Sequence, residues 1–393
     1  MSRASSGLLA RGDNLEVLRG LMPKFAGRCR LVLADPPYNA RNRKDYPDDL
    51  DSSQWLSWLA PRLDLVCQFL SSDGILACHI DDSEQAALQV ALDRMLGRER
   101  RINTVCVKMS ELSGVKMRYQ DRLLPRVKEY VLLYGAGPAA KLRPLRRPKS
   151  PDRLVSYAGY YRWFLENPDD PVESWKIVPL REAAKSRGLP DVPESQDRLR
   201  EEHPERCVYR TNNRWFSSLP QAQRPLSSLA QLVSPWGESY VWWEGRQMLF
   251  LSDHLDEPLS DLWTDISTIN LGREGGVPFP SGKKPEALVK RLMELCTDPG
   301  DLVLDPFCGS GTTAAVAHKT GRDWISVELD PDIAERARQR IERVVAGAAP
   351  TGITAVRGWT GGGSFHTTGF AARDLPHAGE GEHSGAGFAS FGA

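Results

Sequence analysis

The first part of the chain alternates between short apolar runs and longer stretches in which apolar residues recur at helical spacing. The mainly apolar runs at 31–34, 74–80 and 129–135 are typical of strands buried in a sheet. The segments 52–70 and 82–97 between them have the periodicity of amphipathic helices. Candidate N-caps precede both, namely Ser52 or Ser53 and Asp82 or Ser83. Strands that alternate with helices predict a mainly parallel sheet.

The same alternation resumes at residue 263. Leu288, Leu292 and Leu295 share one face of a helix that we expect over 285–296. A strand over 302–304, a helix over 311–320, a strand over 324–329 and a helix over 330–345 follow. Both parts of the chain therefore predict an α/β fold, a doubly wound and mainly parallel sheet of the Rossmann-like type.

The middle of the chain has a different character. The segment 137–153 is rich in proline and arginine without a period, and it predicts a linker or an arm. Seven of the eleven tryptophans lie between Trp163 and Trp263, in a region with no clear element order. We therefore divide the chain into halves of one domain at 1–140 and 263–345, an insert at 141–262, and a glycine- and alanine-rich tail at 346–393. The tail predicts a late strand pair followed by disorder.

Charge and composition exclude several classes of protein. The 393 residues include 51 basic and 51 acidic side chains, so no global field draws the chain to an anionic polymer, although local basic patches remain able to bind phosphates. No apolar run predicts a membrane span or a signal peptide, and we expect a cytoplasmic protein. The seven cysteines include no Cys-x-x-Cys pair, which argues against a metal site or a disulfide framework.

The segment "LVLADPPYNA" at 31–40 ends a buried strand on Asp35 and then places two prolines that cannot donate to a sheet. Alone, this pattern is typical of a strand-terminating turn. It returns as "LVLDPFCGSGTT" at 302–313. Two strands of the same pattern, each ending in Asp-Pro and a loop, indicate more than a turn.

The second loop has the features of a ligand-binding strand–loop–helix unit. Gly309 and Gly311 allow close approach to the backbone, and the helix start offers free N–H groups. Glu328 ends the next strand, where an acid can bind ribose hydroxyls. The absence of Gly-Lys-Ser/Thr excludes a P-loop, whereas a dinucleotide site remains open locally. Because little patterned sequence follows Glu328, upstream strands must complete the sheet, and the two loops would then face one crevice.

Asp-Pro-Pro-Tyr followed far downstream by Asp-Pro-Phe-x-Gly-x-Gly resembles the circularly permuted beta group of amino-methylating DNA methyltransferases. Further segments resemble the modification subunits of type III restriction systems. They are "GDNLEVL" at 12–18, "HIDDSEQAAL" at 79–88, "KEYVLLY" at 128–134, "DISTINLGREG" at 265–275 and "SGKKPEAL" at 281–288. The resemblance covers roughly 8–135 and 263–345.

The resemblance implies methyl transfer from S-adenosyl-L-methionine to an exocyclic amine of DNA. Asp35 and the Pro36 carbonyl would accept the N–H bonds of that amine, with Pro37 helping to fix the carbonyl. Tyr38 would stack on a flipped base, although a tyrosine packed under a turn is the alternative. Asp35 and the type III segments favour adenine N6 over cytosine N4.

The resemblance also implies a set of cofactor-binding residues. Asp13 would bind the adenine amino group, Glu328 the ribose, and Lys284 with Pro285 the methionine end. The loop residues that would line the cofactor are Asp305, Phe307, Gly309, Gly311 and Thr312. Asp13 as an ordinary N-cap, and Lys283 and Lys284 as a solvated pair, remain alternatives.

The insert would recognise double-stranded DNA. Arg143, Arg146, Arg147 and Lys149 would contact phosphates, although a solvated surface over an ordinary aromatic core is the alternative. The resemblance also implies a homodimer and a restriction subunit as partners. A non-catalytic DNA-binding subunit, an RNA methylase and a methylase of protein glutamine remain rival functions. The last class typically begins its tetrapeptide with Asn.

Overall fold

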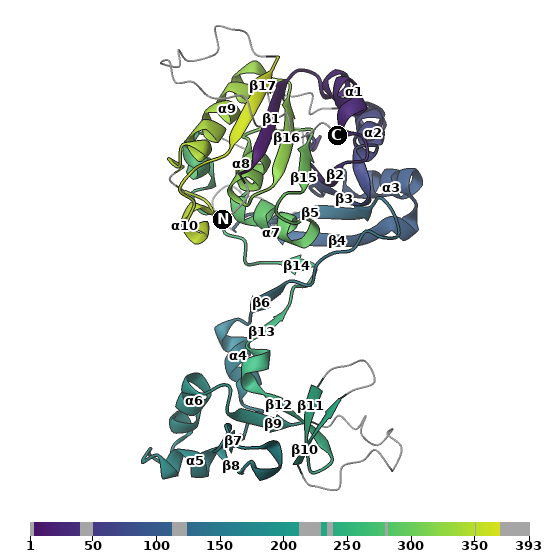
Figure 1. Cartoon of the computed structure of the whole chain (residues 1–393). Coiled ribbons are helices and arrows are strands. Elements are labelled where there is room, and N and C mark those ends of the chain that lie inside the picture. The colour runs from purple at the N-terminus through teal and green to yellow at the C-terminus, as the bar shows by residue number, and fades with distance from the viewer. Residues whose placement is uncertain are drawn as a thin grey trace. The chain divides into compact units, whose positions relative to one another are not determined.

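The computed structural model describes residues 4–39, 50–111, 124–211, 229–233, 239–279, 282–349 and 351–369. The chain divides into two compact units, the first made of Met1–Pro144 and Ser260–Ala393 and the second of Leu145–Leu259. Figure 1 shows the course of the chain through both. Across these described ranges, no helix has the length and apolar character needed to cross a membrane.

The described residues of the first unit contain a nine-stranded sheet of order β14-β4-β5-β3-β2-β15-β16-β1-β17. Its strands are β1 (Ser6–Arg11), β2 (Cys29–Ala34), β3 (Leu70–Ile80), β4 (Arg101–Lys108), β5 (Lys128–Gly135), β14 (Leu262–Trp263), β15 (Leu302–Asp305), β16 (Asp323–Glu328) and β17 (Ser364–Thr368). Neighbouring strands pair parallel except at β5, which is antiparallel to β3 and β4. The predicted mainly parallel sheet is confirmed.

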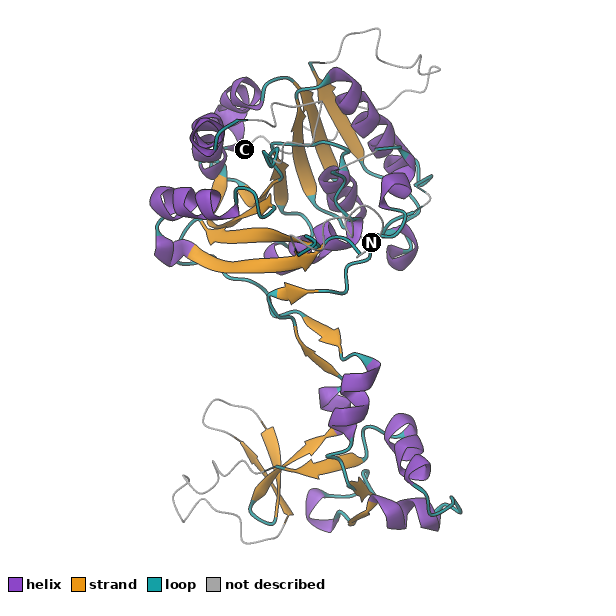
Figure 2. Cartoon of the chain, turned by 180° about the vertical axis from the view of Figure 1, so that it is seen from behind, coloured by secondary structure: helices purple, strands orange, loops and turns teal. Residues whose placement is uncertain are grey.

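Helices cover both faces of this sheet (Figures 1 and 2). On one face α1 (Asn14–Phe25), α2 (Ser52–Cys67) and α3 (Gln85–Leu96) pack side by side, and on the other α7 (Glu286–Cys296), α8 (Thr312–Lys319) and α9 (Pro331–Val345) do so. Side chains alternate between the faces of a strand. Accordingly Val32, Leu76 and Leu304 point into the core formed with α1 to α3. The doubly wound α/β fold predicted from the sequence is confirmed.

The start of α2 differs by one position from the predicted cap. Asp51, rather than Ser52 or Ser53, is the N-cap, because its carboxylate accepts hydrogen bonds from the N–H groups of Ser53 and Gln54. The Gln54 side-chain oxygen in turn accepts a hydrogen bond from the Asp51 N–H, which completes a capping box.

The predicted caps of α3 are wrong. The helix begins at Gln85, and neither Asp82 nor Ser83 satisfies its free N–H groups. Asp82 instead accepts hydrogen bonds from Lys128 and from the Tyr130 hydroxyl on β5. The Asp82 carboxylate therefore binds side chains of the distant strand β5 instead of capping the N-terminus of α3.

The second unit contains, within its described residues, a six-stranded antiparallel sheet of order β10-β11-β12-β9-β7-β8 and a two-stranded ribbon of β6 and β13. The strands are β6 (Arg146–Pro148), β7 (Trp163–Leu165), β8 (Ile177–Pro179), β9 (Cys207–Arg210), β10 (Leu229–Val233), β11 (Ser239–Trp243), β12 (Arg246–Phe250) and β13 (Asp256–Pro258). The helices are α4 (Pro151–Ala158), α5 (Leu180–Ser186) and α6 (Pro193–Glu202). Tyr161, Phe164 and Trp242 are buried, so part of the aromatic content forms an ordinary core.

Part of the basic segment 137–153, predicted to be a linker or an arm, forms the strand β6 of the ribbon. Arg146 pairs with Asp256 across it (Nε to Oδ1, 2.6 Å), and Arg147 pairs with Glu257 (Nη2 to Oε1, 3.0 Å). These cations therefore have carboxylate partners in their own chain.

The tail contributes one strand rather than the predicted strand pair. α10 (Thr354–Arg357) is followed by β17, which pairs parallel with β1 at the edge of the sheet. The first part of the predicted pair forms the short helix α10 instead of a strand. The disorder expected toward the C-terminus falls on residues 370–393, which lie outside the described residues.

The layer of α7, α8 and α9 is held by a buried carboxylate. Glu286 is 0% exposed and lies 2.8 Å from both Lys319 Nζ on α8 and Arg340 Nη2 on α9. Burial alone would raise the pKa of Glu286, but the charges of Arg340 and Lys319 outweigh burial and hold the pKa below its ordinary value. Three helices therefore share one charge cluster.

We predict that Glu286→Gln lowers the free energy of unfolding by about 3–5 kcal/mol, because it leaves two buried cations without their counter-charge. Urea unfolding followed by circular dichroism measures this loss. Glu294→Gln on the same helix removes a partly exposed pair with Lys290 (2.9 Å) and should cost less than about 1 kcal/mol. Equal losses in both variants would contradict the structural role assigned to Glu286.

Candidate active site

The two Asp-Pro loops meet at a topological switch point. β2 and β15 pair parallel, with Leu31 opposite Val303 and Val32 opposite Leu304. The helix that follows β15 lies on one face of the sheet, and the helix that follows β2 lies on the other. A crevice forms at the carboxyl ends of strands wherever connections diverge in this way.

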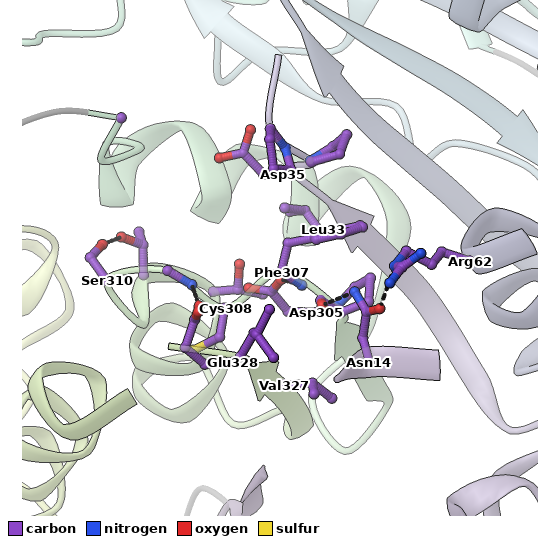
Figure 3. A pocket seen from close by; sticks show the side chains of 18 of the residues that line it. Asn14, Leu33, Asp35, Arg62, Asp305, Phe307, Cys308, Ser310, Val327 and Glu328 are labelled. Carbon is purple, nitrogen blue, oxygen red and sulfur yellow. Dashed lines mark hydrogen bonds between the residues drawn. The ribbon is translucent and has the colours of Figure 1, made fainter. Parts of the chain in front are cut away.

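A pocket occupies this crevice. It is lined by eleven of the thirteen predicted site residues, namely Asp13, Asp35, Pro36, Pro37, Tyr38, Lys284, Asp305, Phe307, Gly309, Thr312 and Glu328. Figure 3 shows Asp35 on one side of the pocket and Asp305, Phe307 and Glu328 on the other. The two predicted residues that do not line it are Pro285 and Gly311. Pro285 is the N-cap of α7.

Gly311 serves the fold in a way that the sequence did not indicate. Its φ of 74° is left-handed, and a Cβ added there would lie 3.2 Å from the Cβ of Ala337 on α9. Gly309 also has a positive φ, of 52°, but a Cβ there would meet only the Phe307 carbonyl, at 3.9 Å. The space kept open for a ligand therefore lies at Gly309, whereas Gly311 allows α9 to approach the loop.

Glu328 ties the glycine loop to β16. Its Oε2 accepts the Gly309 N–H at 2.7 Å, and its Oε1 accepts the Asp330 N–H at 3.1 Å. The Glu328 side chain also lines the pocket. The predicted contact with ribose hydroxyls stays a prediction that this position permits.

Asp305 is a buried acid, 2% exposed, at the end of β15. Burial raises its pKa to about 7, opposed by hydrogen bonds from Thr313 and the Phe307 N–H and reinforced by the charges of Asp35 and Glu328. The carboxylates of this pocket thus repel one another. A cation bound among them would favour the ionised form of Asp305.

Asp13 has two structural roles beside its place in the pocket. Its Oδ1 accepts the Leu15 N–H at 2.9 Å, which confirms the N-cap interpretation. Its Oδ2 lies 2.8 Å from Arg62 Nη2 on α2. The predicted contact of Asp13 with an adenine amino group stays a prediction.

One wall of the pocket was missed by the sequence analysis. Trp58 and Arg62 lie one turn apart on α2, with the Arg62 guanidinium 4.4 Å from the Trp58 ring centroid. Arg62 Nε donates to Asn14 Oδ1 at 2.8 Å, and the Trp58 and Phe307 ring centroids are 6.1 Å apart. An arginine and a tryptophan four residues apart, on the helix that follows Asp35, were the available signal.

The Asp35 loop is anchored on both sides. Trp55 Nε1 donates to the Pro37 carbonyl at 2.8 Å, and the Asn39 side chain donates to Glu84 Oε1 at 2.8 Å. Tyr38 is only 7% exposed, and its hydroxyl donates to Glu129 Oε2 at 3.0 Å. Burial and the neighbouring charges raise the pKa of Tyr38 well above its ordinary value, so the hydroxyl stays protonated.

Two lysines before α7 are both buried, so the interpretation as a solvated pair is wrong. Lys283 donates to the carbonyls of Glu274 at 2.6 Å and Val277 at 2.8 Å, and burial together with the charge of Arg340 lowers its pKa to about 8. Lys284 is 6% exposed and points at the Asp35 loop, with Nζ 4.5 Å from the Tyr38 ring centroid. The same ammonium group donates to the Tyr38 hydroxyl, so this cation lies at the hydroxyl end of the ring.

The sequence matches the model of a known protein family over most of its length. The family model N6_N4_Mtase, described as DNA methylase, matches residues 29–339. The matched range includes both Asp-Pro loops and the second unit.

Two curated relatives agree with that match. The "Probable type III restriction-modification enzyme HindVI Mod subunit" of Haemophilus influenzae is 30% identical over 92% of this chain and 53% of its own length. The type II methyltransferase M.EcaI of Enterobacter cloacae is 24% identical over 86% of this chain and 70% of its own. Among solved structures, the PvuII DNA methyltransferase (cytosine-N4-specific) is 14% identical with a TM-score of 0.48, over 92% of this chain and 95% of that one. The chain thus spans about half the length of the Haemophilus relative.

We predict that Gly311→Ala costs more stability than Gly309→Ala. Both alanines would pay about 1–2 kcal/mol for a left-handed backbone, but only the one at 311 also meets Ala337. Thermal unfolding of the two variants against the parent chain measures the difference. A larger loss at Gly309 would show that the close approach of α9 does not decide the residue at 311.

Proposed function

Because the chain belongs to the DNA methylase family, we propose that it is a site-specific DNA methyltransferase that acts on the exocyclic N6 of adenine. The observation that carries the proposal is one pocket lined by two loops of different chemistry. The loop at 305–313 has the glycine and acid pattern of a nucleoside site, and the loop at 35–38 presents a carboxylate beside it. The chain spans about half the length of its Haemophilus relative, and that relative's substrate and partners are therefore proposed for this chain, not inferred from the match alone.

The pocket residues fit S-adenosyl-L-methionine. When bound, this cofactor supplies an electrophilic methyl group on a positively charged sulfur. Four acids line the pocket, namely Asp13, Asp35, Asp305 and Glu328, against the two cations Arg62 and Lys284, each of which already has a carboxylate partner. Burial is the main cause of the raised pKa of Asp305, and the negative charges of Asp35 and Glu328 add to it. Trp58, Phe307 and Leu329 offer apolar surface for an adenine ring.

Asp35 and the Pro36 carbonyl would accept hydrogen bonds from the target amine. An exocyclic amine is a poor nucleophile because its lone pair is conjugated into the ring. Two acceptors for its N–H groups favour a pyramidal nitrogen and stabilise the positive charge that develops on it. Pro36 and Pro37 have fixed φ angles, which limits the directions that the Pro36 carbonyl can take.

Adenine is favoured over cytosine N4 on the resemblance of the tetrapeptide and on the type III relatives. Both bases present the same kind of amine to Asp35, so cytosine N4 is the second candidate. The intact Asp35–Tyr38 tetrapeptide lines the same pocket as the glycine loop, which argues against a subunit that only binds DNA.

The second unit, within the insert at 141–262, is proposed as the part that recognises double-stranded DNA. The predicted phosphate contacts of Arg143, Arg146 and Arg147 would require these side chains to exchange their partners Asp298, Asp256 and Glu257 for phosphates. A restriction subunit as partner is supported by the Mod relatives, whereas the homodimer and the cytoplasmic location stay predictions from the sequence.

Incubating DNA from a methylation-free host with the purified chain and S-adenosyl-L-methionine tests the proposal. Digestion to nucleosides and mass analysis should reveal N6-methyladenine and no N4-methylcytosine. Asp35→Ala should abolish the product while calorimetry finds cofactor affinity within about threefold of the parent, because Asp35 acts on the target amine. N4-methylcytosine alone would move the assignment to the second candidate, and no modified base would refute both.

Cofactor affinity should depend on pH through Asp305. Below its pKa of about 7 the free pocket holds this acid protonated, so a cationic cofactor must displace the proton. Affinity should therefore fall roughly tenfold per pH unit as pH drops below 7, and level off above it. Calorimetric titrations from pH 5.5 to 8.5 measure the slope, and Asp305→Asn should flatten it while leaving the cofactor's own ionisation as background. An equal slope in both chains would exclude Asp305 as the cause.

A further inference from the structure

A buried group of charges lies directly behind Asp35. Lys284 Nζ is 3.3 Å from Asp35 Oδ1 and 2.9 Å from Glu129 Oε2. The Tyr38 hydroxyl bridges Glu129 and Lys284, since it donates to Glu129 and accepts a hydrogen bond from Lys284. Two segments distant in sequence, those of Glu129 and Lys284, thus converge on the loop that would hold the target amine.

The topology explains how Glu129 comes to this place. β5 is antiparallel to β3, with Val131 opposite His79 and Tyr130 opposite Ile80. The start of β5 therefore lies at the edge of the sheet where the parallel strands end. Glu129 shares a face with Val131 and His79, which is the face that α7 and the residues before it cover.

The charges of the group can be counted. Asp35 and Glu129 carry one negative charge each and Lys284 one positive charge, which leaves a net charge of −1 beside the pocket. Burial alone would lower the pKa of Lys284, but the charges of Asp35 and Glu129 outweigh burial and raise it, so the ammonium form persists. Without Glu129, Lys284 would neutralise Asp35 at the position where the reaction develops positive charge.

We propose that Lys284 and Glu129 form a positioning pair, which fixes Asp35 and Tyr38 while leaving one net negative charge for the target amine. This inference rests on the proposed function. The sequence analysis placed Lys284 at the methionine end of the cofactor, but its ammonium group lies within 3.3 Å of two carboxylates and a hydroxyl. Both members of the pair act through Asp35 and Tyr38.

Other ionisable groups face Asp35 from neighbouring elements. His79 on β3 is fully buried, and burial with the charge of Lys284 lowers its pKa to about 4, so it adds no second cation. Asp305 on β15 shares the pocket and interacts with Asp35 through its charge. Burial raises the pKa of the Cys78 thiol on β3, which stays neutral. Lys284 is therefore the cation that balances these acids at the Asp35 loop among the described residues.

Four chains test the pair: the parent, Glu129→Gln, Lys284→Met and the double variant. For each, kcat and KM for methyl transfer to DNA are measured from pH 5.5 to 9, and cofactor Kd is measured by calorimetry. Glu129→Gln should lower kcat about tenfold or more, with Kd within about threefold, because Lys284 then cancels the charge of Asp35. Lys284→Met should move the acid limb of the kcat profile to higher pH, because two carboxylates then repel each other.

The double variant discriminates most sharply. It restores a net charge of −1 on Asp35 alone, so its kcat should exceed that of Lys284→Met at neutral pH instead of showing the product of the two losses. Lys284→Arg keeps the charge and should retain more activity than Lys284→Met. As a matched control, the Lys290–Glu294 pair on α7, at 2.9 Å, is removed by Lys290→Met with Glu294→Gln, which should leave kcat unchanged.

The outcomes test the positioning pair and the proposed function separately. An active parent chain whose single losses multiply in the double variant, or whose acid limb does not move in Lys284→Met, overturns the positioning pair and leaves the proposed function intact. A parent chain that transfers no methyl group overturns both. If Lys284→Met fails to bind cofactor, the other two variants decide. A loss of kcat in Glu129→Gln with activity retained in Lys284→Arg still supports the pair. An unchanged kcat in Glu129→Gln with activity lost in Lys284→Arg overturns it.

Discussion

The parallel pairing of β2 with β15 is the constraint on which the pocket depends. The hydrogen bonds between these strands join two segments that lie at opposite ends of the sequence, and they set the register of Leu31 with Val303 and Val32 with Leu304. That register brings both Asp-Pro loops to the same edge of the sheet. The helices that follow the two strands pack on opposite faces, so the loops diverge and leave a crevice between them. A pocket of this kind cannot form from either half of the chain alone.

Buried charge then stiffens each side of the crevice. On the side of the glycine loop, Arg340 Nη1 donates to the Ser310 carbonyl and to Thr312 Oγ1, at 2.8 Å for the latter, and Arg340 Nη2 donates to Glu286. The glycine loop is therefore coupled to the packing of three helices. On the other side, Lys284 reaches the Asp35 loop from the segment directly before Glu286. A single turn of chain, 284–286, thus links both loops through opposite charges.

The alternating pattern of apolar runs was sufficient to predict the fold class, because the fold class depends on periodicity along continuous segments. The shared crevice of the two loops was inferred from the little patterned sequence that follows Glu328, which requires upstream strands to complete the sheet. The pattern of Asp35 and of Asp305 with the glycines was likewise local, and it marked the pocket. What escaped prediction depends on contacts between distant segments. The Arg62 and Trp58 wall, the Glu129 partner of Lys284 and the approach of α9 to Gly311 all join elements whose spacing in sequence has no regular relation. The order of elements in the second unit was not predicted either, because its short strands carry no clear period.

The way the second unit is attached has a consequence for how such chains can diversify. Its first and last residues adjoin, since the Leu259 N–H donates to the Leu145 carbonyl at 2.8 Å, and β6 and β13 form a ribbon next to them. A segment whose ends already touch can be exchanged for another of different length and sequence without moving the strands on either side. Recombination at this ribbon would replace the whole second unit in a single genetic event, while every residue of the pocket stayed in place.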